Sequence, residues 1–365
     1  VFGKVMDLSG CAKSIAETIV AKAGRGKELW AVVLSCAIIT YGGVSLFVAA
    51  FAIYPIGAAL FRETDIPKRL LPPAIALGAF TFTMTAIPGT PQIQNTIPMA
   101  YFGTDTFAAP VLGIVAALIM LLGGMFWLTL RLKKAKAAGE GYGDHPNENL
   151  ADIDISKLPP FAIAITPILA VLVLNLILSK FVLPGMDHAY LEEKYNTTYS
   201  AVGGTWALVI ALVIGILLTV VLNRSRFEKG IVESLKEGAN SSLLAIMNTA
   251  SEVGYGNVIK TLPAYALLAA GLLSISSNPL IGEAIASSVM AGVTGSASGG
   301  LSIALATFAD SFKAAADASG ISYEVLHRVA SVACGGLDTL PHNGAVITLL
   351  MATGMTHKEC YLNIA

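Results

Sequence analysis

Long apolar runs separated by short polar segments dominate the chain. Three of these runs, 107–130, 161–183 and 201–222, are each close to the roughly 20 residues that a helix needs to cross a bilayer. Within a bilayer the backbone must satisfy its own hydrogen bonds, which a helix does within one segment. The pattern therefore predicts an all-α polytopic membrane protein in which these three runs are ordinary transmembrane helices.

Two longer apolar runs are interrupted by small and polar residues. The run 28–61 is broken at residues 40–43, and the run 282–312 is broken at residues 295–300. Lys and Arg flank the first run on both sides and are sparse around the second, and these residues concentrate in cytoplasmic loops. We expect the first run to be a re-entrant helical hairpin that enters from the cytoplasm, and the second to be a hairpin that enters from outside.

Stretches rich in Pro, Gly and amide residues interrupt two further apolar runs. The run 70–102 contains such a stretch at 87–95, and the run 325–355 contains one at 333–344. No continuous helix tolerates this density of Pro and Gly. Because irregular backbone at membrane depth occurs only where it is buried in protein or lines a cavity, we expect each run to be an unwound transmembrane helix.

Short matches relate the two ends of the chain. Phe2–Val5 resembles Tyr255–Val258, Gly42–Ser45 matches Gly299–Ser302, and Thr90–Gln92 corresponds to Leu340–His342, all in the same order and at nearly constant offset. Inverted-topology repeats of this kind are typical of secondary transporters. Since the sequence starts at Val1 and stops just after an apolar run, we also expect helices to be missing at both ends. The predicted division is a first repeat over 1–130, a cytoplasmic linker over 131–160, connecting spans over 161–240 and a second repeat over 241–365.

Composition and charge support lipid as the solvent of most of the chain. Only 13% of the 365 residues are charged, against about 25% in soluble domains, and the mean hydropathy is +0.71. Lys and Arg accumulate in 131–157 and 223–237 but not in 184–200, which places the first two segments in the cytoplasm and the third outside. A net charge of −1 without a basic stripe argues against a nucleic-acid partner. The four scattered cysteines form no metal motif, and we expect no metal or cofactor.

The breaks gather residues that can bind a carboxylate. Each break creates a half-helix N-terminus whose unpaired N–H groups favour an anion, and no acidic cluster lies at the hairpin tips. Small residues in membrane helices also serve close packing, but four breaks at matched positions favour one central site. The expected substrate-binding residues are Thr40, Tyr41, Gly42, Gly43 and Ser45 of the first hairpin, Thr90, Gln92 and Asn95 of the first unwound stretch, Ser298, Gly299, Gly300 and Ser302 of the second hairpin, and Thr339, His342 and Asn343 of the second unwound stretch.

Ionisable residues inside a membrane are costly and mark functional candidates. Asp338 and His342 lie in the second unwound stretch, and Glu252 lies beside a glycine-rich bend. These three are the candidates for binding a coupling cation, and imidazole titrates close to physiological pH, so His342 suits a proton. Glu252 has an alternative role in a structural ion pair with Lys260. We expect the other histidines, which are His145, His188, His327 and His357, to lie in or near loops and to be solvated.

Two segments resemble the gluconate permease family of the ion transporter superfamily. Residues 2–10, FGKVMDLSG, resemble the family segment F-G-K-x-M-x-x-S-G, and residues 87–95 are similar to the G-T-P…N unwound loop of the superfamily. The likeness covers most of the chain. It implies two inverted halves, commonly a homodimer, and symport of a hydroxy-carboxylate with a proton or sodium ion across a bacterial inner membrane.

The sequence of the first hairpin tip indicates which substrate to expect. Residues 40–47 together with 86–92 look most like the D-beta-hydroxybutyrate permease branch, whereas gluconate carriers typically show F-F-D-V-G-F at this tip and this chain has no acidic residue there. A small hydroxy-monocarboxylate such as 3-hydroxybutyrate, or gluconate, is the expected substrate. One alternative is a cation/proton antiporter of the same superfamily with Asp338 as ion site. Another is an intramembrane serine hydrolase built on Gly295–Gly299 and His342, although its elbow requires a strand-to-helix turn.

Overall fold

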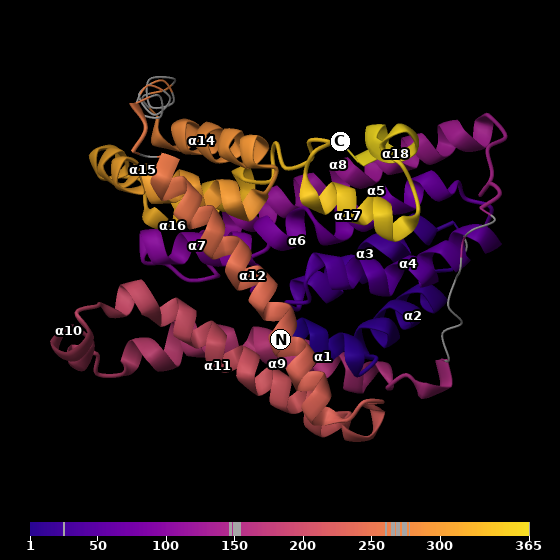
Figure 1. Cartoon of the computed structure of the whole chain (residues 1–365), viewed down its shortest axis with the longest axis horizontal. Helices are drawn as coiled ribbons and strands as arrows, with labels where there is room; N and C mark the ends of the chain where they lie inside the picture. The colour runs from indigo at the N-terminus through magenta and orange to yellow at the C-terminus, as the bar shows by residue number, and fades with distance from the viewer. Residues whose placement is uncertain are drawn as a thin grey trace.

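Helices form the regular structure of the described chain, which comprises residues 1–24, 26–145, 148, 155–259, 261–263, 267, 271, 276 and 278–364 of a computed structural model (Figure 1). Short 3₁₀ or π turns join some of them. In chain order the helices are α1 (Phe2–Leu8), α2 (Cys11–Ala23), α3 (Glu28–Tyr41), α4 (Leu46–Glu63), α5 (Leu71–Ala79), α6 (Phe82–Thr85), α7 (Ile93–Phe102), α8 (Pro110–Ala137), α9 (Phe161–Ile177), α10 (Ala189–Tyr195), α11 (Tyr199–Leu222), α12 (Ile231–Ile259), α14 (Pro279–Thr294), α15 (Ala297–Ser319), α16 (Tyr323–Ala333), α17 (Gly344–Thr353) and α18 (His357–Ile364).

Four helical segments within the described residues are long and apolar enough to cross a membrane: α4, α8, the continuous segment Phe161–Gly185 that begins with α9, and α11. The last three correspond to the predicted ordinary spans, which confirms a polytopic helical membrane protein. Large apolar side chains of α8 stay uncovered by protein, as Val111 at 75% and Phe126 at 68% exposure illustrate, and such a surface suits lipid. Because α4 is long enough to cross by itself, its place in a re-entrant hairpin stays a prediction.

Several apolar helices are too short to cross. Helix α17 has 10 residues, which at 1.5 Å per residue is about 15 Å, half of the hydrocarbon core. The chain leaves the helical conformation at 42–45, 86–92, 295–296 and 334–343, which are the Gly- and Pro-containing stretches. At the turn between α14 and α15, Gly295 adopts φ 64°, the left-handed conformation that suits a helix end.

The helices form two bodies, each with its own hydrophobic core. The first core draws buried residues from α1 to α5 together with α8 and α9, and the second draws them from α14, α15 and α16. In the second body α14 and α15 approach closely, because a Cβ on Gly300 would lie 2.1 Å from the backbone nitrogen of Ala291. Only glycine permits this separation.

The two bodies exchange segments at their broken helices. After the first break the chain enters α7, which packs against α15 and α16, and its Phe102 is buried in the second core. After the second break it enters α17, which packs against α4 and α5, and its Leu349 is buried in the first core. Figure 1 shows α17 and α18, in yellow, beside the purple helices of the first body. Each broken helix thus begins in one body and ends in the other.

A buried ionic cluster anchors the linker that follows α8. The carboxylate of Glu148 pairs with Lys68 at 2.8 Å and with Arg62, and it accepts hydrogen bonds from the hydroxyls of Tyr54 and Tyr142 at 2.8 and 2.9 Å. Burial by itself would raise the pKa of Glu148, but the bonds from Lys68 and the two tyrosines outweigh it and lower the pKa to about 2. The linker is thereby fixed to α4 and to the turn that precedes α5.

Candidate functional site

A cavity of about 640 Å³ lies between the two bodies. Helices α5, α6 and α8 form its wall on one side, and α14, α16 and the second break form it on the other. Its volume is in the range of small-molecule sites, and its wall is largely apolar with a few convergent polar groups, as in most ligand pockets. The polar side chains on its wall are Thr81, Thr85, Ser288, Arg328, Asp338, Thr339, Asn343 and Asn363.

Asn343 organises the second break. Its Oδ1 accepts from the backbone N–H of Ala345 and Val346 at 2.7 and 3.2 Å, which caps α17. Its Nδ2 donates to the carbonyl of Gly295 at 2.9 Å and to the carboxylate of Asp338. One buried amide therefore ties the second hairpin turn, the start of α17 and the cavity carboxylate together.

The expected anion-binding N-termini differ in how they are capped. At α15 the hydroxyl of Ser296 accepts from the N–H of Gly299, and at α17 Asn343 takes two N–H groups, so donors at both ends are already in use. Ser45 before α4 and Gln92 before α7 provide no side-chain cap. The N–H groups of the second body are therefore less available to a carboxylate than the sequence suggests.

The first break is closed by its own amide side chains. Gln92 Nε2 donates to the carbonyls of Thr40 and Val44, at 2.7 and 3.0 Å, and so holds the turn between α3 and α4. Asn95 Nδ2 donates to the carbonyls of Thr90 and Thr106, both at 2.9 Å. These two amides are buried, and they stabilise irregular backbone away from the cavity wall.

Arg328 is a fully buried cation that reaches the first break from α16. Its guanidinium donates to the carbonyls of Thr85, Thr106 and Ala108 and to Asn95 Oδ1, at distances between 2.8 and 3.3 Å. These bonds engage all five N–H groups that arginine has. No carboxylate pairs with it in the described part of the chain. Its positive charge therefore lies at the wall of the cavity without a carboxylate in contact, and Asp105, whose charge acts on it, is itself paired with Lys180.

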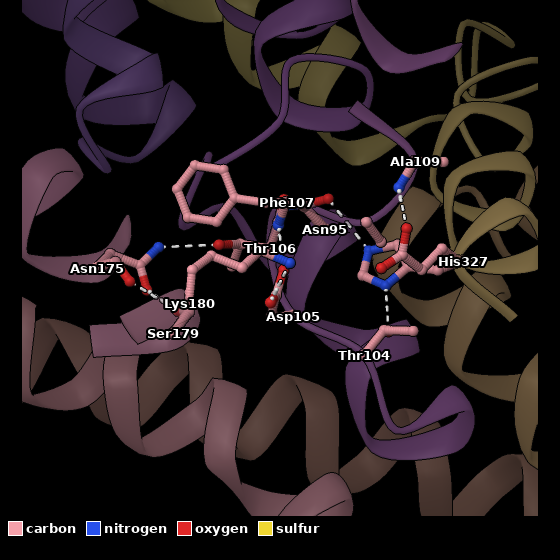
Figure 2. A network of polar contacts seen from close by, with 12 residues as sticks. Asn95, Thr104, Asp105, Thr106, Phe107, Ala109, Asn175, Ser179, Lys180 and His327 are labelled. Carbon is pink, nitrogen blue, oxygen red and sulfur yellow. Dashed lines mark hydrogen bonds and ion pairs between the residues drawn. The ribbon is translucent and has the colours of Figure 1, made fainter. Parts of the chain in front are cut away.

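His327 is buried as well, so its expected solvated position in or near a loop is wrong. Its Nδ1 lies 2.6 Å from Thr104 Oγ1 and its Nε2 lies 3.2 Å from Asn95 Oδ1 (Figure 2). Since Asn95 uses its amide nitrogen as donor elsewhere, its oxygen must accept here and Nε2 must carry the proton. In the neutral imidazole, Nδ1 then accepts from the hydroxyl of Thr104.

A smaller cavity of about 430 Å³ lies on the other side of this histidine and is lined by Thr104, Asp105 and Lys180, among others. Lys180 pairs with Asp105 at 2.8 Å, as Figure 2 shows. The chain of contacts from Thr104 through His327 and Asn95 to Arg328 joins the smaller cavity to the larger one. The sequence analysis did not include Arg328 among the candidate residues, because its position near the start of an apolar run resembles that of a residue beside a loop.

The second break supplies the predicted site residues that line the larger cavity: Asp338, Thr339 and Asn343. His342 lies beside them, with its Nε2 at 2.8 Å from the carbonyl of Gly292. The side chain of Glu252 and the whole of Lys260 are outside the described residues. The other predicted substrate-binding residues lie elsewhere: Thr40, Tyr41, Gly42, Gly43 and Ser45 at the α3–α4 turn, Thr90, Gln92 and Asn95 at the first break, and Ser298, Gly299, Gly300 and Ser302 in the first two turns of α15.

Membrane-crossing helices, broken helices and a cavity between two bodies are together typical of a membrane permease. The GntP family permease model matches residues 1–336, most of this chain, and the chain belongs to that family. The resemblance read from the first residues and the unwound loop is thereby confirmed.

Curated relatives agree with this class. The chain is 46% identical over 380 residues to the uncharacterized transporter YxjC of Bacillus subtilis, covering 100% of this chain and 80% of that relative. It is 30% identical over 177 residues to an uncharacterized transporter of Haemophilus influenzae, covering 48% of this chain and 40% of the relative. An uncharacterized permease of the same organism is 24% identical over 304 residues, covering 80% of this chain and 60% of the relative.

Proposed function

We propose that this permease is a cation-coupled symporter that carries a small hydroxy-monocarboxylate, such as 3-hydroxybutyrate or gluconate, across a bacterial inner membrane. The observation that carries the proposal is the cavity, because it combines a cation that no carboxylate contacts among the described residues with hydroxyls and one carboxyl. Because the N–H groups of Arg328 are all in use, this residue attracts an anion through its positive charge and not by donating hydrogen bonds. That attraction is strong in surroundings of low dielectric constant.

The hydroxyls on the cavity wall supply the hydrogen bonds. Thr81, Thr85 and Ser288 already donate to backbone carbonyls, at 2.6, 3.1 and 2.7 Å, which leaves acceptor capacity on their oxygens. Such oxygens suit the hydroxyl of the substrate, and Thr339 suits its carboxylate as a donor. A substrate with a carboxylate and one hydroxyl matches this set of groups.

Coupling follows from the position of Asp338. A substrate anion in the same cavity repels the Asp338 carboxylate, and a bound proton removes the repulsion, so proton and substrate favour each other's binding. Asp338 is therefore the preferred coupling group, with His342 and Glu252 as the other candidates and sodium as the alternative cation. The exchange of α7 and α17 supports two related halves, and we extend the proposal to inverted repeats with re-entrant hairpins and a homodimer.

The same carboxylate also supports the second candidate, a cation/proton antiporter with Asp338 as ion site. The serine hydrolase has less support, since the turn at Gly295–Ser296 joins two helices and lacks the strand that the elbow requires.

Purified protein in proteoliposomes tests the proposal. An inward proton gradient is expected to drive accumulation of labelled 3-hydroxybutyrate, which a protonophore abolishes and an excess of unlabelled gluconate, lactate or citrate inhibits to graded extents. If the gradient instead drives sodium exchange while no organic acid enters or competes, the antiporter is correct and the symporter is wrong.

A further inference from the structure

Helix α14 carries a buried carboxyl group that is not among the groups proposed above to bind the coupling cation. Glu283 is 0% exposed, and neither of its carboxyl oxygens has a hydrogen-bond partner among the described residues. Ser287, one turn further along the same helix face, is also 0% exposed and its hydroxyl is likewise without a partner there. An ionised carboxylate in such a site would cost several kcal/mol. The group is therefore neutral in this conformation and carries a proton.

The described helices packed against α14 offer this carboxyl no cation. Helix α15 contributes Lys313, which pairs with Asp310 at 2.8 Å, and Asp317, which accepts from the hydroxyl of Tyr323 at 2.9 Å. Glu283 is the only titratable residue of α14 itself. Lys313 and Asp317 thus have partners other than Glu283, and no ion pair with these groups accounts for the burial of its carboxyl.

Helix α16 and the second break are the other described neighbours of α14, and their charged and titratable groups are committed elsewhere. In the second break His342 Nε2 lies 2.8 Å from the carbonyl of Gly292, and Asp338 accepts from Asn343. His327 bonds Thr104 and Asn95, while Arg328 gives all its N–H groups to carbonyls and Asn95. Glu324 accepts from the backbone of Ala109 at 3.3 Å. Ser331 of α16 is buried and its hydroxyl has no partner within the described chain.

Helix α14 also forms part of the wall of the larger cavity. Ala284 and Ser288, which flank the Glu283–Ser287 face, both line that cavity. Adjacent helix positions differ by about 100° around the axis, so a rotation of α14 by up to that angle would bring Glu283 to the cavity. Water in the cavity would then stabilise the ionised form, and the proton would leave to that water.

We propose that Glu283 is a second proton-carrying site of this transporter, protonated while α14 is packed as here and deprotonated when α14 turns toward the cavity. The inference rests on the proposed symport. It adds one coupled proton to the one assigned to Asp338, and it makes movement of α14 the step that exchanges this proton with water.

The test compares Glu283→Gln with wild type in proteoliposomes. Glutamine keeps the size of a protonated glutamic acid but binds no proton. With the membrane potential clamped at zero and a gradient of one pH unit, losing one coupled proton lowers the steady-state accumulation ratio of 3-hydroxybutyrate about tenfold. Exchange of labelled for unlabelled substrate needs no net proton movement and is expected to continue. Glu63→Gln, the same change at an exposed position at the end of α4, is expected to match wild type.

Each outcome has a distinct meaning. Equal accumulation ratios for wild type and Glu283→Gln would overturn the inference while leaving symport intact. Absence of accumulation by wild type would instead refute the proposed symport. Infrared spectroscopy of purified protein tests whether Glu283 is protonated, and this measurement needs no substrate. At neutral pH the C=O stretching band of a protonated carboxyl is expected in wild type and missing from Glu283→Gln, and identical spectra would contradict the proposal even if that variant no longer transports.

Discussion

The two breaks share a composition rich in Pro, Gly and amide residues but differ in what their side chains do. At the first break Gln92 and Asn95 give their amide N–H groups to backbone carbonyls, and Arg328 satisfies further carbonyls. At the second break Asp338 and Thr339 lie on the wall of a cavity. Matched sequence positions therefore do not imply matched roles. In this conformation the first break anchors the structure and the second presents polar groups to the cavity.

Replacement of Arg328 has the largest expected effect and tests whether the first break anchors the structure. Arg328→Met removes the donor to three carbonyls and to Asn95, and leaves these buried acceptors unpaired, so we expect a loss of about 3–5 kcal/mol in stability. Thermal unfolding in detergent, followed by size-exclusion chromatography, measures it, with Arg224→Met at an exposed position as control. If Arg328→Met were as stable as wild type, the first break would not anchor the structure.

Acidification is the second test, and it acts on Glu148, which anchors the linker to the first body. The pKa of Glu148 is lowered from 4.5 to about 2 in the folded protein. Its contribution is therefore fully present above pH 4.5 and is lost as the pH falls toward 2, about 3 kcal/mol over that window. We expect the unfolding temperature to fall in this range. Glu148→Gln should start lower at pH 7, because Lys68 loses its partner, and should change less with acid; a parallel decline of both proteins would contradict the assignment.

Asp338→Asn sharpens the contrast on the side of the second break. The variant keeps a side chain for Asn343 to contact but binds no coupled proton, so the accumulation ratio is expected to fall about tenfold per pH unit of gradient. Exchange should persist and thermal stability should stay close to wild type. Full gradient-driven accumulation by this variant would exclude Asp338 as the coupling group.

A matched pair of conservative changes gives the smallest effects. Thr339→Val removes one hydroxyl from the cavity, and we expect a 5- to 10-fold weaker apparent affinity, about 1 kcal/mol, at unchanged stability. Gln92→Leu removes the bonds to Thr40 and Val44, and we expect a loss of about 1–3 kcal/mol in stability. Unfolding temperatures and concentration-dependent uptake separate the two. The opposite distribution of effects would reverse the roles given to the breaks.

The spans could be predicted because length and apolarity act locally. The lipid-crossing runs required only counting, and the Gly and Pro stretches marked where helices end. Gly295 and Ser296 also carried a signal, since glycine at a helix end followed by a serine N-cap places the second turn there and puts Gly299 and Gly300 inside α15. The repeats, the hairpins and the binding role of the site residues stay predictions.

Burial of His327 and Arg328 could not be predicted from their surroundings in the sequence. The acceptors of Arg328 lie between 220 and 243 residues away along the chain, at the two ends of the first break and in the segment between α7 and α8. An arginine beside a histidine near the start of an apolar run has the local pattern of a loop flank. The packing of α16 against α6, α7 and α8 brings it to the carbonyls that make its burial tolerable.

The exchange of α7 and α17 has a consequence for how the protein is made. Leu349 of α17 is 0% exposed in the first core, yet residues 344–353 leave the ribosome only after the whole second body has been synthesised. The first body must therefore wait in the membrane with the α17-facing side of α4 and α5 unfilled by its native partner. Insertion and folding of the two bodies cannot be independent events, and a stalled chain lacking α17 would present a recognisable defect to membrane quality control.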